Sequence, residues 1–313
     1  MSSRILPTLE MATNKNQSNK VMSKLAKTIL ITGASTGFGR DTAETLTREG
    51  YVVFASFRDI AVRNKYHAEA LRSAGINVVE LDVTNNDSVE RGVSNVLSQA
   101  GQIDVLVNNA GIASAGVSEA FTVEQVRDLF EVNVFGIQRV LRAVLPTLRK
   151  QRDGLVINIG SILGRVTFPF FGLYGASKYA VEALTDSYRY ELSQLGVDVV
   201  LVQPSAYPTN MYGSAQQPDD KARSEACGEI GTIPGKMFGT FQEIFQSKNA
   251  PNPHDVPEAI AKLVGQTKGK RPARVVVGEP YGSDVVNLSV EPVQAQVIDG
   301  LGLGQLAKIR SSL

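Results

Sequence analysis

Seven short runs of β-branched and other apolar residues recur along the chain, with helical stretches between them. They occupy residues 27–32, 51–57, 76–81, 103–108, 154–160, 197–203 and 273–278. Each run is apolar throughout instead of alternating with polar residues, which is typical of strands covered on both faces. Parallel strands joined by right-handed helical crossovers meet this requirement. The pattern therefore predicts an α/β fold in which seven parallel strands form one doubly wound sheet.

The regular succession of strands and helices is interrupted between Ala206 and Pro253. A polar stretch, QQPDDKARSEACGEIGTIPGK, is followed there by an apolar one, MFGTFQEIF. Ligands of open α/β sheets bind beyond the carboxyl ends of the strands, so a helical insertion after the sixth strand is placed to close such a site. A surface excursion with a small packed helix is the alternative. Because no Pro- or Gly-rich linker precedes residue 206, we expect residues 27–280 to form a single domain containing the 206–253 insertion.

The two ends of the chain differ from this central region. Residues 1–26 are rich in Ser, Asn and Lys, and we expect a disordered N-terminal lead-in. A transit peptide is the alternative, although Glu10 and the single arginine, Arg4, argue against it. Residues 281–313 form a C-terminal extension that could pack on the core, cover a pocket or join a neighbour. Without a secretory signal or an apolar run of bilayer length, we expect a cytoplasmic protein with no membrane span.

The bulk composition narrows the classes of function. The chain has 313 residues, of which 43% are hydrophobic, and a formal net charge of +1. A net charge this close to zero argues against nucleic-acid binding, which usually requires a strongly basic surface. We expect the basic cluster at 268–274 to be a solvated turn. With Cys227 as the only cysteine and with His67 and His254 far apart, neither a disulfide framework nor a metal site is expected. Acid/base chemistry then falls to carboxylates, Tyr or Lys.

Tyr174 and Lys178 form a candidate acid/base pair. They lie four residues apart in LYGASKYAVEAL, on what is predicted to be one face of a helix. An ammonium one turn away favours the phenolate form of a tyrosine and is expected to lower its pKa. Such a spacing is common by chance on amphipathic helices, so its meaning depends on the motifs upstream.

A glycine-rich loop, TGASTGFGR, follows the first predicted strand directly. Gly33, Gly37 and Gly39 precede a helix predicted from Arg40 to Arg48. Glycines allow close backbone contact with a ligand, and the first amides of the helix suit a pyrophosphate. A tight turn without a ligand is the alternative. The strand before the loop and the helix after it favour dinucleotide binding.

These residues and their order resemble the short-chain dehydrogenase/reductase family over roughly residues 27–280. The matching positions are Thr32, Gly33, Gly37 and Gly39 for TGxxxGxG, Asn108 to Gly111 for NNAG, and Asn133, Ser161, Tyr174 and Lys178 for the catalytic tetrad. The glycine spacing resembles the compact subgroup, and ASFRD and VLVQPSAYPTN are similar to members near 17β-hydroxysteroid and retinol dehydrogenases. The resemblance implies a Rossmann fold and an oxidoreductase.

The resemblance implies a role for each member of the tetrad. Tyr174 exchanges the proton, and Lys178 lowers the pKa of Tyr174 and contacts the nicotinamide ribose. Ser161, at the end of the fifth predicted strand, holds the substrate oxygen and steadies developing charge. Asn133 belongs to a water chain that relays protons. The structural alternatives are a helix cap or turn for Ser161, a buried amide bond for Asn133 and a solvated side chain for Lys178.

The resemblance also implies cofactor contacts along the strand ends. These are Gly33, Ser35, Thr36, Gly37, Phe38 and Gly39 in the glycine loop, Arg58, Asp82 and Val83 after the second and third strands, Asn109, Ala110 and Gly111 after the fourth, and Tyr174, Lys178, Pro204 and Thr209 near the nicotinamide. Asp82 is expected to accept from the adenine, with a helix cap near Asn86 as the alternative. Pro204-Ser205 stands where a Pro-Gly pair is common in the family.

The end of the second predicted strand bears on the choice of nicotinamide cofactor. NAD enzymes usually carry an acid there to bind the ribose hydroxyls, whereas NADP enzymes supply a cation. This strand ends in Ala-Ser-Phe followed by Arg58, whose guanidinium suits a phosphate. A surface ion pair between Arg58 and Asp59 is the alternative. The sequence favours NADP(H), with NAD(H) as a second possibility.

Apolar side chains lie on both sides of the expected chemistry. They are Phe168, Phe170 and Phe171 before Tyr174, and Tyr207, Met211, Tyr212, Met237, Phe238 and Phe241 in the insertion. Core packing is the alternative to a pocket for these side chains. As substrate contacts we expect Ser161, Phe168, Phe171, Tyr174, Tyr207, Met211 and Phe238. The predicted substrate is a small hydrophobic ketone, aldehyde or secondary alcohol, as in a carbonyl reductase.

Two other classes of function compete with this prediction. One is a non-catalytic NAD(P)-binding regulatory or redox-sensing protein, and the other is an isomerase or dehydratase on the same scaffold. The intact tetrad argues against the first, and the compact glycine spacing argues against the second. Residues 119–149 and 178–195 are predicted to form two long helices, which the family commonly uses for subunit contacts. By analogy we expect a homodimer or homotetramer.

Overall fold

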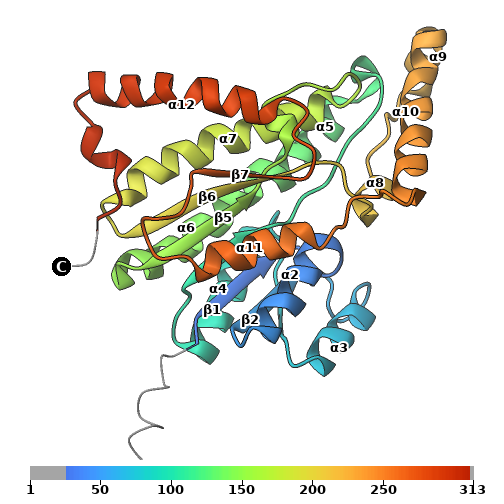
Figure 1. Cartoon of the computed structure of the whole chain (residues 1–313). Helices are drawn as coiled ribbons and strands as arrows, with labels where there is room; N and C mark the ends of the chain where they lie inside the picture. Colours follow the sequence, from blue (N-terminus) through green and yellow to red (C-terminus); the bar gives the residue numbers. More distant parts are fainter. Residues whose placement is uncertain (1–25, 311–313) are drawn as a thin grey trace, which may run out of the picture.

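The structure, a computed structural model, describes residues 26–310 (Figure 1). The predicted lead-in therefore lies outside the described residues, apart from its last position. Seven strands form one parallel sheet in the order β3-β2-β1-β4-β5-β6-β7. Their bounds are Thr28–Thr32, Val52–Phe57, Asn77–Glu80, Val105–Asn108, Gly154–Ile159, Val197–Pro204 and Arg274–Val277 for β1 to β7. Each lies within two residues of its predicted position, and the doubly wound α/β fold is confirmed.

Helices cover both faces of the sheet. The first face packs against α2 (Gly37–Arg48), α3 (Lys65–Ser73) and α11 (Asp255–Gly265), and the second against α4 (Asn86–Ala100), α6 (Gly136–Gln151) and α7 (Gly172–Ser193). Side chains of the strands alternate between the two layers, so that Ile29 and Ile31 join the first core and Leu30 the second. Because both layers are apolar, the strands are apolar throughout, which is the pattern that the sequence showed.

The two central strands determine where a ligand can bind. β1 pairs with β4, although β2 and β3 lie between them in the sequence. The chain therefore winds outward in opposite directions from this pair, and a crevice opens at the carboxyl ends of the two strands. The helix predicted from Arg40 begins three residues earlier, at Gly37, so its first turn faces that crevice.

The insertion after β6 is helical, as predicted. It contains α8 (Asn210–Gly213), α9 (Lys221–Ala226) and α10 (Glu229–Gln246), and Figure 1 shows α10 projecting beyond the carboxyl end of the sheet. Phe238 and Phe241 of α10 are partly buried and pack against the buried cluster around Phe171. The polar stretch thus contains α9 and the first turns of α10, and the apolar stretch forms the second half of α10, which packs on the Phe171 cluster.

The C-terminal extension packs on the domain in this structure. Helix α12 (Ser283–Gly300) lies beside α7 in Figure 1, and the side chain of Asn287 donates to Gln203 Oε1 of β6 at 2.7 Å. Farther along, the amide of Arg310 donates to the carbonyl of Ser193 at 2.9 Å. None of the helices between residues 26 and 310 combines the length and apolar character needed to cross a bilayer.

The two long helices expected at 119–149 and 178–195 differ from the prediction in their starts. The first is divided into α5 (Val123–Phe130), a π-helical turn (Glu131–Phe135) and α6. It begins later because Thr122 and Gln125 form a capping box. The second, α7, already begins at Gly172, which places Tyr174 and Lys178 on the same helix.

Candidate active site

The turns that follow β1 and β4 are hydrogen-bonded to each other. Thr32 Oγ1 accepts from the amides of Asn109 and Ala110, both at 3.1 Å. The side chain of Asn109 donates to the carbonyls of Thr32 and Gly33 at 3.0 Å. Gly33 has a φ of +66°, and a Cβ at that position would lie 2.6 Å from Ala110 Cα. The glycine motif and the NNAG turn are therefore one rigid unit, in which only glycine fits at residue 33.

The amino end of α2 is open toward this unit. Thr36 occupies the N-cap position, but its side chain makes no capping hydrogen bond. The first amides of a helix have no partner within the helix, and together with the positive end of the helix dipole they suit a pyrophosphate. Gly37 has a φ of +57°, and a Cβ there would meet nothing closer than Thr209 Cβ at 4.0 Å. The backbone can thus approach a ligand closely at this point.

A cleft extends from α2 toward the end of β2, and two arginines line it. Arg58 and Arg63 both face the cleft. Among residues 26–310 neither guanidinium forms an ion pair, so the pair between Arg58 and Asp59 that the sequence allowed is not formed. The loop that carries them is held firmly, since Glu80 accepts from the amides of Asp59 at 2.7 Å and Ile60 at 2.9 Å. Two unpaired cations therefore stand on a fixed loop beside the cleft.

Asp82 and Val83 line the same cleft, opposite the glycine turn. Asp82 Oδ1 accepts from the amide and the hydroxyl of Thr84, at 2.9 and 2.8 Å. The cap of α4 is Asn85, whose side chain accepts from the amide of Ser88 at 2.9 Å. The helix cap that was the alternative for Asp82 is thus made by Asn85, and Asp82 keeps an oxygen for a ligand.

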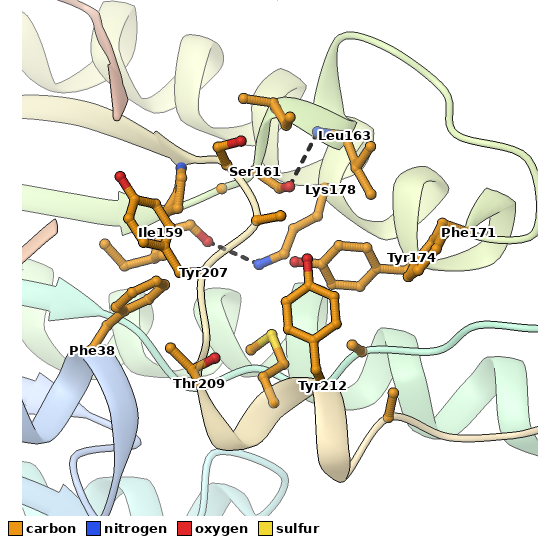
Figure 2. A pocket seen from close by; sticks show the side chains of 18 of the residues that line it. Phe38, Ile159, Ser161, Leu163, Phe171, Tyr174, Lys178, Tyr207, Thr209 and Tyr212 are labelled. Atoms are coloured by element: carbon orange, nitrogen blue, oxygen red, sulfur yellow. Dashed lines mark hydrogen bonds between the residues drawn. The ribbon is translucent and has the colours of Figure 1, made fainter. Parts of the chain in front are cut away.

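The chemical groups meet in a second pocket, where Figure 2 shows Ser161, Tyr174 and Lys178 converging. Lys178 Nζ donates to the carbonyl of Ile159 at 2.9 Å and lies 5.6 Å from the centroid of the Tyr174 ring. A Cβ on Gly111 would lie 3.8 Å from the same Nζ, so the ammonium also reaches the NNAG turn. Ser161 Oγ accepts from the amide of Leu163 at 3.1 Å, and its hydroxyl interacts with that of Tyr174.

Burial decides the protonation of this pair. The Tyr174 side chain is buried, which raises its pKa to about 12, and the nearby Ser161 hydroxyl offsets only part of this rise. Burial also lowers the pKa of Lys178 to about 8. The lowered tyrosine pKa expected from the four-residue spacing is therefore wrong, because removal from water disfavours the charged form of each group more than their proximity stabilises it.

Asn133 lies in the π-helical turn, beneath the NNAG turn. Its Oδ1 accepts from the amide of Ile112 and its Nδ2 donates to the carbonyl of Ile112, both at 2.9 Å. The same Nδ2 also donates to Ser177 Oγ at 3.0 Å, and Ser177 Oγ donates to the carbonyl of Tyr174 at 2.7 Å. π-Turns occur frequently at functional sites. This π-turn positions the Asn133 side-chain amide so that its hydrogen bonds connect the NNAG turn to α7, the helix that carries Tyr174 and Lys178.

Most of the predicted site residues line these two spaces, which adjoin. The shared lining residues are Phe38, Asn109, Thr209 and Met211. The cleft further includes Gly33, Ser35, Thr36, Gly37, Arg58, Asp82, Val83, Ala110 and Gly111, and the pocket includes Ser161, Phe168, Phe171, Tyr174, Lys178, Pro204 and Tyr207. A continuous crevice thus runs from the two arginines to the Tyr/Lys pair.

Four predicted residues occupy other positions than expected. Gly39 lies behind the cleft, where a Cβ would come within 2.4 Å of the Asn109 side chain, so its role is packing. Phe238 packs behind Phe171, with ring centroids 6.4 Å apart, and does not line the pocket. Asn133 lies outside both linings. Tyr207 borders the pocket but is almost fully buried, and its hydroxyl donates to Asp255 at 3.3 Å.

Several lining residues were not included in the predicted site. The most informative are Arg63 in the cleft and Tyr212 and Phe241 in the pocket. Arg63 carried a sequence signal, since it follows Arg58 within one loop. Tyr212 and Phe241 had been noted only as aromatic residues of the insertion. No group of three or more His, Cys, Asp or Glu side chains that could hold a metal occurs in the part of the chain that the structure describes.

Comparison with known sequences agrees with this geometry. A sequence profile described as short chain dehydrogenase matches residues 27–220. The 3-ketodihydrosphingosine reductase of Bacteroides thetaiotaomicron is 34% identical over 251 residues, which cover 80% of this chain and 87% of the relative. Retinol dehydrogenase 8 of Homo sapiens is 30% identical over 259 residues, which cover 79% of this chain and 80% of the relative.

Solved structures with the same fold include proteins that hold nicotinamide cofactors. A short-chain dehydrogenase from Streptomyces avermitilis superposes with a TM-score of 0.72 at 30% identity, over 90% of this chain and 99% of that chain. A Burkholderia phymatum member in complex with NAD gives a TM-score of 0.69 at 25% identity, over 87% and 95%. A variant of the actinorhodin polyketide ketoreductase with NADPH gives 0.68 at 26% identity, over 82% and 97%.

Proposed function

This chain belongs to the short-chain dehydrogenase/reductase family, and from that premise we propose that it is an NADP(H)-dependent carbonyl reductase with Tyr174 as its proton donor. Members of the family are oxidoreductases that act on CH–OH and C=O groups. The proposed substrate is a hydrophobic ketone or aldehyde, or the corresponding alcohol in reverse. The single observation that carries the proposal is the crevice that joins the glycine turn to a pocket with converging Ser161, Tyr174 and Lys178 side chains.

The residues of the crevice fit a nicotinamide dinucleotide. The uncapped N-terminus of α2 suits the pyrophosphate. Because Gly33 and Gly37 have no side chains, the backbone there can lie close to the cofactor. Lys178 reaches Gly111 and is placed to bind the nicotinamide ribose, while Asp82 retains an oxygen for the adenine. When bound, the nicotinamide supplies the hydride, and the protein supplies position and polarity.

The protein groups act on the substrate oxygen. The Ser161 hydroxyl donates to that oxygen and steadies the negative charge that develops there. Tyr174 transfers its phenolic proton to the oxygen as the C–O bond becomes single, so that hydride and proton together convert the carbonyl into an alcohol. A pKa of about 12 keeps the phenol protonated at neutral pH, which is the form that reduction requires. Asn133 is proposed to hold the turn from which a water chain returns a proton to Tyr174.

Replacement of both Arg58 and Arg63 by alanine is expected to remove the preference for NADPH. Each guanidinium is unpaired and borders the end of the crevice where the extra phosphate of NADPH would lie. Hydrogen bonds to a charged group contribute roughly 1.5–3 kcal/mol each. The KM for NADPH should therefore rise by at least about tenfold per arginine, since a tenfold change corresponds to about 1.4 kcal/mol. Steady-state kinetics with both cofactors measure the effect.

The matched control for this prediction is NADH, which lacks the phosphate. Its KM should stay within about threefold of the wild-type value in the double variant, because the backbone contacts of the cleft are kept. A parallel loss for both cofactors would show that the arginines hold the loop and not the phosphate. The arginines would then no longer favour NADP(H) over NAD(H).

The pH profile of reduction is expected to show one alkaline limb. Lys178 is charged below its pKa of about 8 and loses its charge above it, whereas Tyr174 stays protonated up to a pKa of about 12. Binding of the anionic cofactor beside Lys178 then weakens as the pH rises, and kcat/KM for NADPH should fall about tenfold per unit above pH 8. In a Lys178→Arg variant this limb should be absent, since arginine keeps its charge. An unchanged limb in that variant would assign the ionisation to another group.

A screen of NADPH consumption against a panel of hydrophobic ketones and aldehydes tests the proposed function directly. Turnover of at least one substrate, with the alcohol identified as product, distinguishes an oxidoreductase from a regulatory NAD(P)-binding protein. It also distinguishes it from an isomerase or dehydratase, which would give a product at the same oxidation level. Tight NADPH binding without any turnover across the panel would favour the regulatory protein.

The domain organisation and the oligomeric state belong to the same proposal. We propose that residues 27–280 form one catalytic domain, with 206–253 as its substrate loop and 281–313 as an extension. Both core layers draw on residues from β1 to β6, which supports a single unit. A homodimer or homotetramer stays a prediction, and light scattering after size-exclusion chromatography measures it.

A further inference from the structure

Tyr212 presents a hydroxyl to the pocket beside that of Tyr174. It comes from α8, on the wall opposite α7, and Figure 2 shows its oxygen directed toward the Tyr174 hydroxyl and Lys178. Burial raises the pKa of Tyr212, and the neighbouring phenols of Tyr174 and Tyr281 raise it further. Within residues 26–310 the Tyr212 hydroxyl has no hydrogen-bond partner. A neutral donor therefore faces the reaction space without an acceptor.

The ring of Tyr212 is fixed by its neighbours on α10. Its centroid lies 5.6 Å from that of Phe241 and 5.1 Å from that of Phe245. Phe241 in turn contacts Phe171, which precedes α7, at 6.2 Å. Contacts with two neighbouring rings of one helix restrict the orientation of the Tyr212 ring. They favour the orientation in which its hydroxyl faces the pocket.

Ser161 and Tyr174 already supply the hydrogen bonds that the oxygen of the reacting carbonyl can accept. A carbonyl oxygen accepts two hydrogen bonds in the plane of its substituents, and these two hydroxyls are proposed to supply both. A third donor beside them needs a second acceptor. Tyr212 is half-buried, and a ligand that fills the pocket would displace water from its hydroxyl. An acceptor on that ligand, close to the reacting carbon, would restore the hydrogen bond.

The charge of the lining limits what this second group can be. Among the described residues, Lys178 is the only charged side chain that lines the pocket, and its ammonium is already bonded to the carbonyl of Ile159. A substrate ammonium would be buried without a counter-ion, and a substrate carboxylate would have only the Lys178 ammonium, which is already engaged, so either charge is costly. The rest of the wall is uncharged and largely apolar, with Leu163, Phe168 and Phe171 among its residues. The pocket therefore suits a neutral group on an otherwise hydrophobic molecule.

We propose that Tyr212 is a specificity-determining residue that selects neutral carbonyl substrates bearing a second hydroxyl or carbonyl oxygen one or two carbons from the reacting carbon. Its hydroxyl donates to that second oxygen while Ser161 and Tyr174 hold the first. The inference rests on the proposed function, because it takes the reacting carbonyl to lie at Tyr174. The preferred substrates are thus hydroxyketones and diketones with an aliphatic or aromatic remainder.

A matched pair of ketones tests this inference, namely 2-octanone and its 1-hydroxy derivative, each assayed for NADPH consumption. The wild-type kcat/KM is expected to be at least about tenfold higher for the hydroxyketone, because 2-octanone displaces water from the Tyr212 hydroxyl without offering it an acceptor. In Tyr212→Phe this preference should disappear. The kcat/KM for the hydroxyketone should fall about tenfold, and the kcat/KM for 2-octanone should fall less than about threefold. The ratio of the two substrates is unaffected by the fraction of folded enzyme.

Tyr188→Phe is the matched control. The Tyr188 hydroxyl donates to Gln138 Oε1 at 2.6 Å and Tyr188 does not line the pocket, so its removal should leave the preference unchanged. Equal wild-type rates for the two ketones, or an equal loss of both in Tyr212→Phe, would overturn the assignment of Tyr212 while the reductase activity stood. Absence of turnover with any carbonyl in the wild type would overturn the proposed function and this inference together.

Discussion

Replacement of Tyr174 by phenylalanine is expected to lower kcat for carbonyl reduction by roughly 10³-fold, within the range of about 10²–10⁴ that positioned acids contribute. The phenol lies on the same helix as Lys178 and converges with it in the pocket. Ser161 cannot replace it, because an aliphatic hydroxyl is a far weaker acid. Since phenylalanine has the same ring, the packing against Phe171 and the neighbouring turn should be kept. Initial rates of NADPH oxidation with an accepted ketone measure the loss.

Two measurements make this prediction specific. The dissociation constant for NADPH, taken from its fluorescence, should stay within about threefold of the wild-type value, because the phosphate-binding backbone is untouched. Tyr207→Phe is the matched control, since the Tyr207 hydroxyl is directed to Asp255 and away from the reaction space. That variant should keep most of its turnover. Undiminished NADPH oxidation in Tyr174→Phe would rule out the role of proton donor.

The fold was predictable because burial on both faces leaves a strong signal in a strand. Leu30 and Ile31 point to opposite layers, and both are fully buried. Seven such runs indicated the number of strands and their approximate ends. The division of the 119–149 segment was not predicted, because the π-helical turn continues directly from α5 into α6 and no proline marks it. What defines that turn is a set of contacts made by Asn133 with residues far away in the sequence.

The positions of the site residues could be predicted more fully than their ionisation. Motifs placed the glycine turn and the Tyr/Lys pair, since those depend on local geometry at strand and helix ends. The direction of the Tyr174 pKa shift depends on how much protein surrounds the phenol, and spacing along a helix does not report burial. Arg63 and Tyr212 were missed for a related reason. Each lies on a connecting segment whose path across the crevice is set by tertiary contacts.

Gly33→Ala is expected to destabilise the folded protein by about 2–5 kcal/mol. The left-handed backbone at φ +66° costs an alanine roughly 1–2 kcal/mol. The added Cβ would also lie 2.6 Å from Ala110 Cα, and overpacking against a backbone that cannot move adds roughly 1–3 kcal/mol. Thr32 and Asn109 bind the two turns to each other, so the strain cannot be relieved by moving one turn alone. Urea unfolding followed by circular dichroism measures the change.

Gly50→Ala separates the two contributions. Gly50 has a φ of +87°, but nothing lies within 4 Å of the position that its Cβ would take. Gly50→Ala should therefore lower the free energy of unfolding only by the cost of the left-handed backbone, about 1–2 kcal/mol. Gly33→Ala should lower it further, by the cost of the contact with Ala110. Gly33→Ala should also weaken NADPH binding, because displacement of the joined turns moves the backbone that faces the pyrophosphate, whereas Gly50→Ala should not. If the two variants unfolded at the same urea concentration and bound NADPH equally well, the two turns would not form the rigid unit on which the cofactor site depends.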